Sequence, residues 1–486
     1  MNKRITAGLL GYLTLFTGAA MLPSFVLATI SGEFGGAAAF LLSIFLCVAV
    51  TFELERFGGL KGKDNIDVRD GIAVTGLGWF LVSILGTIPY FAGGYLNLID
   101  SFVESFAGFS GTGATVFNDV EILPKSILLW RSVSNWIGGL GIVVIFMALL
   151  SQFGRGAMFI LRAESTGPTK DRQMPRIRDN AKILFKIYVG MTVICAISYF
   201  FCGLNIFAAI NHAMTTIATG GYSIYNSTVD EYGNAYLEYC MAFFMIISSG
   251  SFAMYAVAVN HGISTIFRNT EFKIYLQIIF VAIIVISVDL ILEMNLNPEI
   301  AIRNAIFHVA SLSSTTGFVA NDFDLYPPIS KIFLIMTMFL GGCAGSTAGG
   351  LKVARIILLF KFVALIVRQK IHPKLINQIK LNGRTVDENI VYGAAKFFFV
   401  VVVMDIIFAF VMMFDGIEFT DAISVSVSTM ASVGPGFGIE GATSTYALLP
   451  NLSKIFACIF MFLSRLEVFT VLVLFTPQFW KNPKGW

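Results

Sequence analysis

Four short segments rich in threonine, serine and glycine supply the oxygen atoms that a cation needs when it leaves water. They read Ser-Gly-Thr-Gly-Ala at 110–114, Ala-Thr-Gly-Gly-Tyr at 218–222, Ser-Thr-Thr-Gly-Phe at 314–318 and Ala-Ser-Val-Gly-Pro at 431–435. Rings of backbone carbonyls replace the hydration shell of an ion in selective filters. Glycine adopts the backbone conformations needed to turn successive carbonyls to one side. No carboxylate occurs in the four segments, which favours a large monovalent cation over a divalent one.

We predict that the four segments form a cation-selective filter, to which each segment contributes four residues. The glycine that they are expected to share is Gly113, Gly220, Gly317 and Gly434. The predicted filter residues are Ser110, Gly111, Thr112, Gly113, Ala218, Thr219, Gly220, Gly221, Thr315, Thr316, Gly317, Phe318, Ser432, Val433, Gly434 and Pro435. The backbone carbonyls expected to bind the cation are those of Thr112, Gly113, Thr219, Gly220, Thr316, Gly317, Val433 and Gly434. One such segment alone is more often a turn or a packing site, but four at one recurring place favour a filter.

The composition indicates that the segments lie within a membrane. Of the 486 residues, 56% are hydrophobic and 13% charged, and the mean hydropathy is +0.78. Runs of about 20 apolar residues, which span a bilayer as helices, occur many times. The net charge of +3 is too small to indicate a nucleic-acid partner. The six cysteines form no CxxC pair, so neither a disulfide framework nor a zinc site is indicated.

The elements that position the segments repeat along the chain. The fold class predicted is an all-α polytopic membrane protein, with four pseudo-symmetric helix–pore helix–helix repeats around a central pore and a transmembrane hairpin before them. The hairpin is expected at 7–30 and 36–55; its first run could resemble a signal peptide, but its length and the second span close behind it favour a retained helix. The expected long first helices are 71–92, 181–203, 274–294 and 389–414; the short helices are 99–110, 206–217, 300–313 and 418–430; the second helices are 127–152, 235–260, 329–368 and 452–477. The expected domains are 1–60, 61–155, 156–265, 266–375 with a broken second helix, and 376–486.

Lysine and arginine predict the orientation of the repeats. They gather before the first repeat, between repeats and at the C-terminus, whereas acidic residues predominate in the loops after the filter segments, with Lys125 and Lys331 as exceptions. By the positive-inside rule, the repeat junctions and both termini face the cytoplasm. Each repeat then crosses the membrane an even number of times, so its short helix must enter and leave by one face. Non-helical backbone at that depth must line a polar cavity or be buried in protein.

A glycine-rich stretch interrupts the second helix of the third repeat. It comprises Gly341, Gly342, Cys343, Ala344, Gly345, Ser346, Thr347, Ala348, Gly349 and Gly350. Because glycine costs about 1 kcal/mol relative to alanine in a helix, the helix is not expected to continue there. The stretch is interpreted as a loop below the filter that obstructs the pore and moves to open it. The alternative is a packing surface of small residues.

Arg465 lies within the apolar second helix of the fourth repeat. An arginine at the bilayer centre costs about 2.5–3.5 kcal/mol on insertion scales, so it needs a partner or a wet cavity. It is predicted to face the pore beneath the filter; the alternatives are a pair with Glu467 and a position near the inner surface.

Other polar residues in apolar segments have simpler expectations. Asp405 is expected to pair within the bundle, and His212 and His308 are expected to pack with a hydrogen bond. Lys352 is expected either to bind carbonyls of the glycine stretch or to mark the cytoplasmic end of its helix.

The chain resembles a superfamily of potassium transporters that includes TrkH, KtrB and KdpA, over essentially its whole length. The resemblance rests on the four filter segments, on Trp-Ile-Gly-Gly-Leu-Gly at 136–141, on the glycine stretch and on Ser-Arg-Leu-Glu at 464–467. The opening hairpin is more similar to TrkH than to KtrB. The fourth segment departs most from the Thr-Thr-Gly pattern, with Val433 before and Pro435 after its glycine.

The resemblance implies uptake of K⁺, and of Rb⁺, across the cytoplasmic membrane of a bacterium. It implies K⁺ as the bound ion, no covalently held cofactor, and a gate in which Arg465 helps to hold the glycine stretch. It also implies a homodimer with one pore per protomer, and a cytoplasmic nucleotide-binding regulatory subunit of the TrkA type. A nucleotide is expected on that partner only.

Three other functions stay as alternatives. The sequence has no P-loop, Ser/His/Asp grouping or HExxH motif, so the chain is predicted not to be an enzyme. It could instead be the ion-binding subunit of an ATP-driven pump, as KdpA is, and would then copurify with an ATPase. A proton- or sodium-coupled carrier needs titratable groups along the ion path, and the filter segments contain none. A non-selective cation channel is the third alternative, because the segments are not identical.

Overall fold

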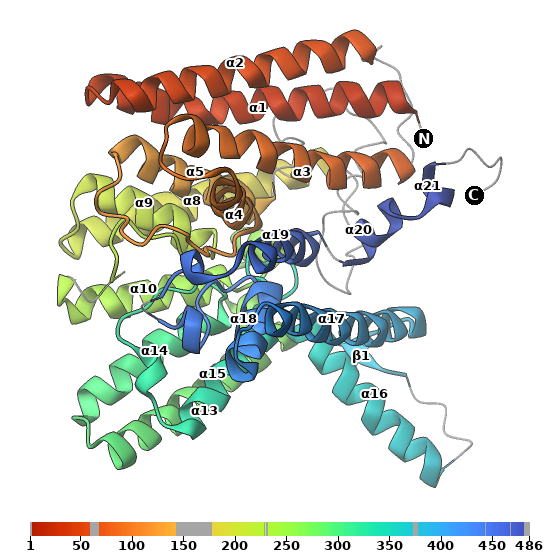
Figure 1. Cartoon of the computed structure of the whole chain (residues 1–486). Coiled ribbons are helices and arrows are strands. Elements are labelled where there is room, and N and C mark those ends of the chain that lie inside the picture. Colours follow the sequence, from red (N-terminus) through yellow and green to blue (C-terminus); the bar gives the residue numbers. More distant parts are fainter. Residues whose placement is uncertain are drawn as a thin grey trace.

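The computed structural model describes residues 2–58, 68–141, 177–227, 229, 232–372, 378–442, 444–466 and 468–480, and the regular elements among them are helices, apart from one pair of two-residue strands. The chain opens with a hairpin of α1 (Lys3–Ile30) and α2 (Phe34–Phe57) along one side of the molecule (Figure 1). Asn2 caps α1 with its side chain. The two helices are joined by a buried hydrogen bond of 2.7 Å between the hydroxyls of Thr14 and Thr51.

The remaining elements recur in the same order. The first set is α3 (Val68–Ala92), α4 (Leu98–Ser110) and α5 (Lys125–Leu140). The second is α8 (Ile177–Phe201), α9 (Ile206–Ile217), α10 (Ala235–Ser248), α11 (Phe252–His261) and α12 (Ser264–Arg268). The third is α13 (Thr270–Met294), α14 (Pro298–Ser313), η2 (Phe323–Leu325), α15 (Pro328–Leu340) and α16 (Val353–Ile371). The fourth is the antiparallel pair β1 (Lys380–Leu381) and β2 (Arg384–Thr385), then α17 (Glu388–Phe414), α18 (Phe419–Ala431), η3 (Gly438–Glu440), η4 (Tyr446–Leu448), α19 (Asn451–Arg465), α20 (Val468–Leu474) and α21 (Pro477–Trp480).

The helices divide by length into those that can span a membrane and those that cannot. Among the described residues, α1, α2, α3, α8, α13 and α17 are long and apolar enough to cross, and there are up to eight spans if the broken pairs α10–α11 and α19–α20 each count as one. The short helices α4, α9, α14 and α18 have 12 to 16 residues. At about 1.5 Å per residue they fall short of a hydrocarbon core about 30 Å thick.

Local sequence explains where the short helices begin. The side chains of Asn97, Asn205 and Asn297 accept hydrogen bonds from backbone N–H groups in the first turns of α4, α9 and α14. The fourth helix, α18, has Glu418 as its N-cap residue, and this residue makes no such bond. The predicted ranges of all four short helices agree with the structure to within two residues.

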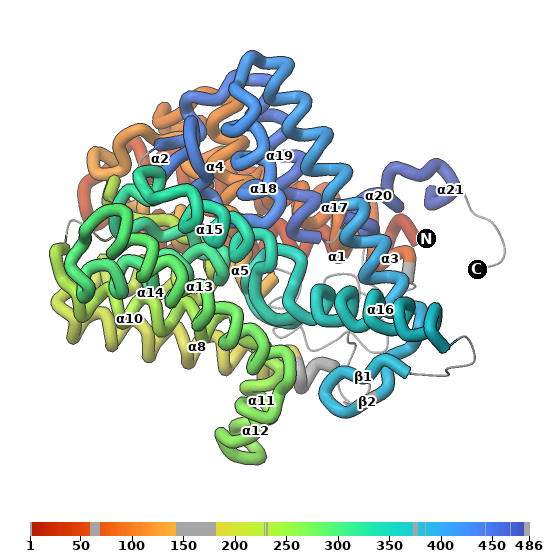
Figure 2. The backbone as a smooth tube through the Cα atoms, turned by 90° about the horizontal axis from the view of Figure 1, so that it is seen from below, coloured from red at the N-terminus to blue at the C-terminus, as the bar shows by residue number. Residues whose placement is uncertain are grey.

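Two predicted second helices are not continuous. The helix expected at 235–260 breaks between α10 and α11, which are bent by 91° and turn apart in Figure 2. The break falls at Ser249-Gly250-Ser251, where the carbonyl of Ser249 accepts a 2.8 Å hydrogen bond from Cys343 N of the third repeat. The helix expected at 452–477 likewise divides into α19 and α20. The helix expected at 127–152 is described only as far as Leu140, and 142–152 lie outside the described residues.

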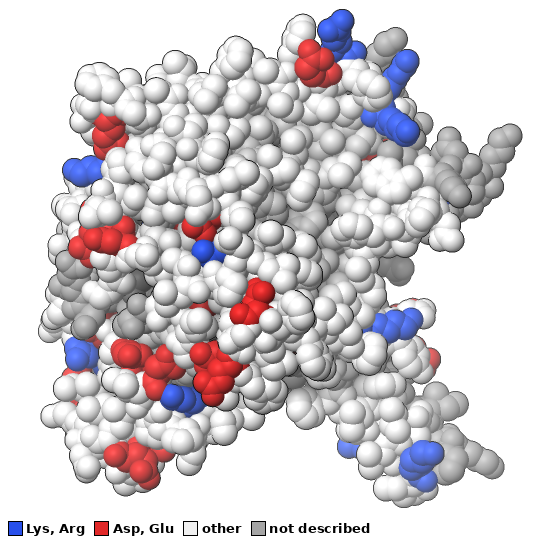
Figure 3. All heavy atoms as spheres, in the orientation of Figure 1, with Lys and Arg blue, Asp and Glu red and all other residues white. Residues whose placement is uncertain are grey.

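The surface fits a membrane environment. Large apolar side chains such as Phe34, Phe201 and Phe414 are more than four-fifths exposed, which in a soluble protein would mark an interaction surface. On the face shown in Figure 3, most acidic side chains lie in the left half, and basic ones dominate the right edge, on the side of both chain termini.

Candidate functional site

The four predicted filter loops follow directly from the short helices and share one backbone pattern. The second residue of each loop has a positive φ: 77° at Gly111, 55° at Thr219, 57° at Thr315 and 59° at Ser432. The fourth residue also has a positive φ: 69° at Gly113, 67° at Gly221, 78° at Gly317 and 97° at Gly434. Left-handed threonine is rare because its branched side chain crowds the backbone. Such strain costs about 1–3 kcal/mol per residue and typically persists at functional sites.

The structure corrects the alignment of the second loop. Gly221, not Gly220, has the conformation of Gly113, Gly317 and Gly434. Gly220 instead corresponds to Thr112. Gly220 N donates to Thr215 O and Thr112 N donates to Ala107 O, both at 3.0 Å and both to the residue five positions earlier in the sequence. Thr316 and Val433 make the equivalent bonds to Ser311 and Ser428. The prediction that Gly220 is the shared glycine is therefore wrong, and two adjacent glycines in this loop explain the error.

The loops meet in a closed ring. A methyl group on the fourth-position glycine of each loop would overlap the third-position carbonyl oxygen of the next loop. The overlaps run from Gly113 to Gly220, from Gly221 to Thr316, from Gly317 to Val433 and from Gly434 back to Thr112. These glycines are therefore required both for their torsion angles and for the close approach of neighbouring backbones. All sixteen predicted filter residues belong to the loops that form this ring.

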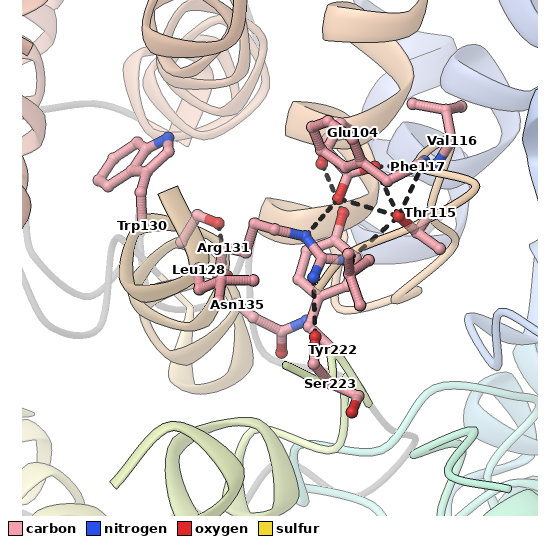
Figure 4. A network of polar contacts seen from close by, with 12 residues as sticks. Glu104, Thr115, Val116, Phe117, Leu128, Trp130, Arg131, Asn135, Tyr222 and Ser223 are labelled. Atoms are coloured by element: carbon pink, nitrogen blue, oxygen red, sulfur yellow. Dashed lines mark hydrogen bonds and ion pairs between the residues drawn. The ribbon is translucent and has the colours of Figure 1, made fainter. Parts of the chain in front are cut away.

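A buried ion pair supports the first two loops (Figure 4). Arg131 of α5 contacts Glu104 of α4 at 2.7 Å, with side chains 2% and 0% exposed. The guanidinium also donates to Ser223 O at 2.8 Å and to Thr115 Oγ1 at 3.1 Å. Glu104 accepts from Val116 N at 3.0 Å. Because Thr115 and Val116 leave the first loop and Ser223 leaves the second, one ion pair fixes both exits.

The pair of Glu104 and Arg131 was not predicted from the sequence, although the position of Glu104 relative to its loop recurs. His212 and His308 occupy the same position before the second and third loops. His308 makes the predicted hydrogen bonds, with Nδ1 3.1 Å from Asn304 O and Nε2 accepting from Ala320 N at 3.4 Å. The expectation for His212 is wrong within the described part of the chain: both ring nitrogens are buried without a hydrogen-bond partner, and the ring packs against Phe318.

The glycine stretch lies against the ends of the short helices. Gly349 N donates to Thr315 Oγ1 at 2.7 Å, and a Cβ at Gly349 would overlap the carbonyl oxygen of Ala431. Thr347 Oγ1 donates to Ile217 O at 3.0 Å. The stretch thus contacts residues of the second, third and fourth repeats. As predicted, the helix does not continue through the stretch, which separates α15 from α16.

Two buried charges hold the stretch in place. Glu271 Oε1, at the start of α13, accepts from Ala344 N at 2.6 Å and from Ala354 N at 3.1 Å. Lys352 Nζ donates to Ala348 O, one of the two predicted roles of this lysine. Sequence reasoning missed Glu271, whose partners lie more than 70 residues away.

Arg465 ends α19 and joins the glycine stretch to the first repeat. Its guanidinium donates to Thr347 O at 3.3 Å, to Gly139 O at 2.6 Å and to Gly138 O. The carbonyls of Gly138 and Gly139 belong to the last turn of α5. Glu467, the alternative partner, lies outside the described residues.

Asp405 of α17 lies beside α18, and its carbonyl oxygen accepts from Ser426 Oγ at 2.7 Å. Among the described residues, no group of three His, Cys, Asp or Glu side chains is placed to hold a metal ion.

A cavity of about 120 Å³ adjoins the ring on the side where the loops exit. Its lining includes the fourth-position glycine of every loop, together with Thr115, Arg131, Tyr222, Ser223, Glu440, Thr445 and Tyr446. Burial raises the pKa of the Glu440 carboxyl well above its ordinary range, and nearby Asp421 raises it further, while Tyr446 lowers it.

Helices long and apolar enough to span a membrane, short helices that cannot span it, and four loops that meet in a ring define a polytopic helical membrane protein. The TrkH family model, described as cation transport protein, matches residues 37–482. The chain belongs to the TrkH family. Membership of a transport family confirms the prediction that it is not an enzyme.

Individual relatives agree over the full length. The Trk system potassium uptake protein TrkH of Halomonas elongata is 33% identical over 486 residues, covering 99% of this chain and 100% of the relative. The protein of the same name from Escherichia coli K12 is 33% identical over 488 residues, with the same coverage. The crystal structure of the potassium transporter TrkH from Vibrio parahaemolyticus matches with a TM-score of 0.90 and 28% identity, covering 99% of this chain and 100% of that one. The predicted class, an all-α multi-pass membrane protein of bacterial type, is confirmed.

Proposed function

We propose that the chain takes up potassium across the cytoplasmic membrane through the ring of four loops. The single observation that carries this proposal is the ring itself, in which each loop repeats two positive-φ positions and abuts the next loop. Such a backbone presents neutral carbonyl oxygens from four sides of one axis, which suits a dehydrated K⁺ or Rb⁺ ion. The names of its relatives, potassium uptake proteins, agree with this substrate.

The substitution Gly317→Ser tests the filter. At φ 78° a side chain is strained, and its Cβ would overlap the carbonyl oxygen of Val433 and approach Pro435 Cδ at 2.7 Å. Rubidium uptake into proteoliposomes is measured with sodium as competitor. The wild type should prefer rubidium and the variant should admit sodium. Equal transport of both ions by the wild type, unchanged in the variant, contradicts the filter and favours a non-selective channel.

The glycine stretch and Arg465 are the proposed gate. Arg465 places a positive charge beneath the ring and ties Thr347 to the end of α5. Replacing it with alanine should raise uptake, because both the barrier to cations and the tie are lost. Arg465→Lys keeps the charge without the planar fork of donors, so it separates the two effects. Unchanged or reduced uptake by well-folded Arg465→Ala, or by a protein with a shortened 341–350 stretch, contradicts the gate.

The proposed setting is a homodimer with the repeat junctions and both termini in the cytoplasm and a nucleotide-binding subunit of the TrkA type docked there. The word "system" in the relatives' names supports a partner, and the basic residues near the termini support the orientation. The large basic segments 153–180 and 366–388 are the proposed docking surfaces. Nucleotide-dependent uptake after adding a TrkA-type subunit tests this; copurification with an ATPase favours a pump instead, and uptake that requires a proton or sodium gradient favours a coupled carrier.

A further inference from the structure

The carbonyl oxygen of Gly434, in the fourth loop, is hydrogen-bonded to side chains that lie outside the loop. Tyr446 Oη donates to it at 3.2 Å. Ser428 Oγ of α18 lies 2.9 Å from Gly434 O and equally close to Pro435 O, so its one proton is shared between them. Both donors are buried, with Tyr446 2% and Ser428 0% exposed. Because a carbonyl oxygen has two lone pairs, the two donors compete with an ion for this oxygen.

The corresponding carbonyls of the other three loops are not held in this way. Within the described residues, no hydrogen bond reaches the carbonyl oxygens of Gly113, Gly221 or Gly317. One position earlier, Gly220 O accepts from Asn135 Nδ2 at 3.0 Å, and this single bond leaves it a second lone pair. The fourth-position carbonyl of the fourth loop is therefore the exception.

The neighbours of Tyr446 direct its hydroxyl proton to the fourth loop. Thr429 Oγ1 lies 3.0 Å from Tyr446 Oη. The carboxyl of Glu440 bonds to the same hydroxyl, and burial raises its pKa well above the ordinary range, so the protonated acid acts as a donor. With two donors facing its oxygen, Tyr446 gives its own proton to Gly434 O. The backbone of Tyr446 is fixed separately, because its N–H donates to Thr115 O at 2.9 Å.

The second repeat contains the same tyrosine–threonine contact without the filter carbonyl. Tyr199 Oη of α8 lies 3.0 Å from Thr216 Oγ1. Thr216 and Thr429 both lie two residues before their loops. Among the described residues, Tyr199 makes no bond to a filter carbonyl. The bond from Tyr446 to Gly434 O is therefore an addition to a contact that otherwise serves packing.

We propose that Tyr446 and Ser428 are specificity-determining positioning residues that hold the Gly434 carbonyl away from the ion. The inference rests on the proposed function, transport through the ring. At this level the cation is then bound by the three other fourth-position carbonyls, with water on the fourth side. The cavity of about 120 Å³ that adjoins all four glycines is large enough to supply that water. Because conduction requires binding weak enough for the ion to leave, one missing ligand at this end of the ring favours passage over retention.

The first experiment compares the half-saturating rubidium concentration of the wild type, Tyr446→Phe and Tyr199→Phe in proteoliposomes. Tyr446→Phe keeps the aromatic ring and frees a lone pair of Gly434 O, so half-saturation should fall by about fivefold, equivalent to about 1 kcal/mol. Tyr199→Phe also loses a buried hydroxyl bonded to threonine, so it is the control for lost stability and should keep the wild-type value. A value for Tyr446→Phe that equals that of Tyr199→Phe, or exceeds that of the wild type, overturns the proposal.

A matched pair of serine variants tests the second donor. Ser311 of α14 donates to Phe318 O at 2.6 Å, which is the counterpart of the bond from Ser428 to Pro435 O. Ser428→Ala should lower half-saturation, and Ser311→Ala should not, because only Ser428 also bonds to Gly434 O. The double variant Tyr446→Phe/Ser428→Ala should show a larger decrease than either single change. Equal values for the two serine variants overturn the role of Ser428.

A second measurement uses the wild type alone, in case the variants do not fold. An experimental structure in rubidium, at a resolution that shows carbonyl orientation, decides between two arrangements. Gly434 O directed at Tyr446 and Ser428 supports the proposal, and Gly434 O directed at an ion on the axis of the ring overturns it. Failure of the proposed function is distinct, because it appears as absence of selective rubidium uptake by the wild type, whereas the orientation of Gly434 O is seen in either case.

Discussion

The buried pair of Glu104 and Arg131 should control both the stability and the selectivity of the protein. The perturbations are Glu104→Gln, Arg131→Met and the double variant. Removing one partner of a buried pair leaves the other charge uncompensated, which costs about 3–5 kcal/mol. Arg131→Met also deprives Ser223 O and Thr115 Oγ1 of a charged donor, so it should be the more damaging single change. The double variant should lose less unfolding free energy than the sum of the two single variants, because it contains no uncompensated buried charge.

The functional consequence follows from the position of the pair. It ties the residues that leave the first loop to those that leave the second. Without it, two of the four loops can shift independently, and the ring should discriminate less against sodium. Heated detergent samples analysed by size-exclusion chromatography give the loss of stability, and rubidium uptake with sodium as competitor gives the selectivity.

A less buried pair is the control. Arg303 is 20% exposed and lies 3.4 Å from Glu238, and partly exposed pairs of this kind contribute about 0–1 kcal/mol. Arg303→Met should therefore cost much less than Arg131→Met. The reasoning is refuted if the two variants are equally stable and equally selective, or if the double variant loses the full sum of its single changes.

Two further predictions concern the glycine stretch. Thr315→Val removes the hydroxyl that accepts from Gly349 N while keeping the size of the side chain; it should raise uptake, whereas Thr337→Val, at a buried threonine bonded within α15, should not. Glu271→Gln weakens two charged hydrogen bonds to the stretch, so it should lower the unfolding free energy by about 1–3 kcal/mol and raise uptake. The exposed Glu293→Gln on the same helix is the control for the second change, and a shared phenotype would count against the role of Glu271.

Hydropathy and helix length predicted the spanning helices, the short helices and the loops between them, because these features depend on local composition. Features set by distant partners could not be predicted. The break at Ser249 depends on Cys343 N from another repeat, and the support from Glu104 depends on Arg131 in a different helix. The register of the second loop was missed because Gly220 and Gly221 are adjacent, and only the backbone torsions distinguish them.

The four loops also show why so divergent a set of sequences can build one ring. In three repeats, a backbone N–H just after the loop donates to a side chain of the short helix before the loop. The donors Val116, Ala320 and Phe437 lie at the same position after their loops, and the acceptors are the side chains of Glu104, His308 and Ser424. A carboxylate, an imidazole and a hydroxyl thus accept the same bond. If the ion is bound by backbone carbonyls, each repeat need keep only its torsions and this acceptor, not the identity of its side chains. The second loop departs from this scheme, because neither ring nitrogen of His212 has a hydrogen-bond partner among the described residues.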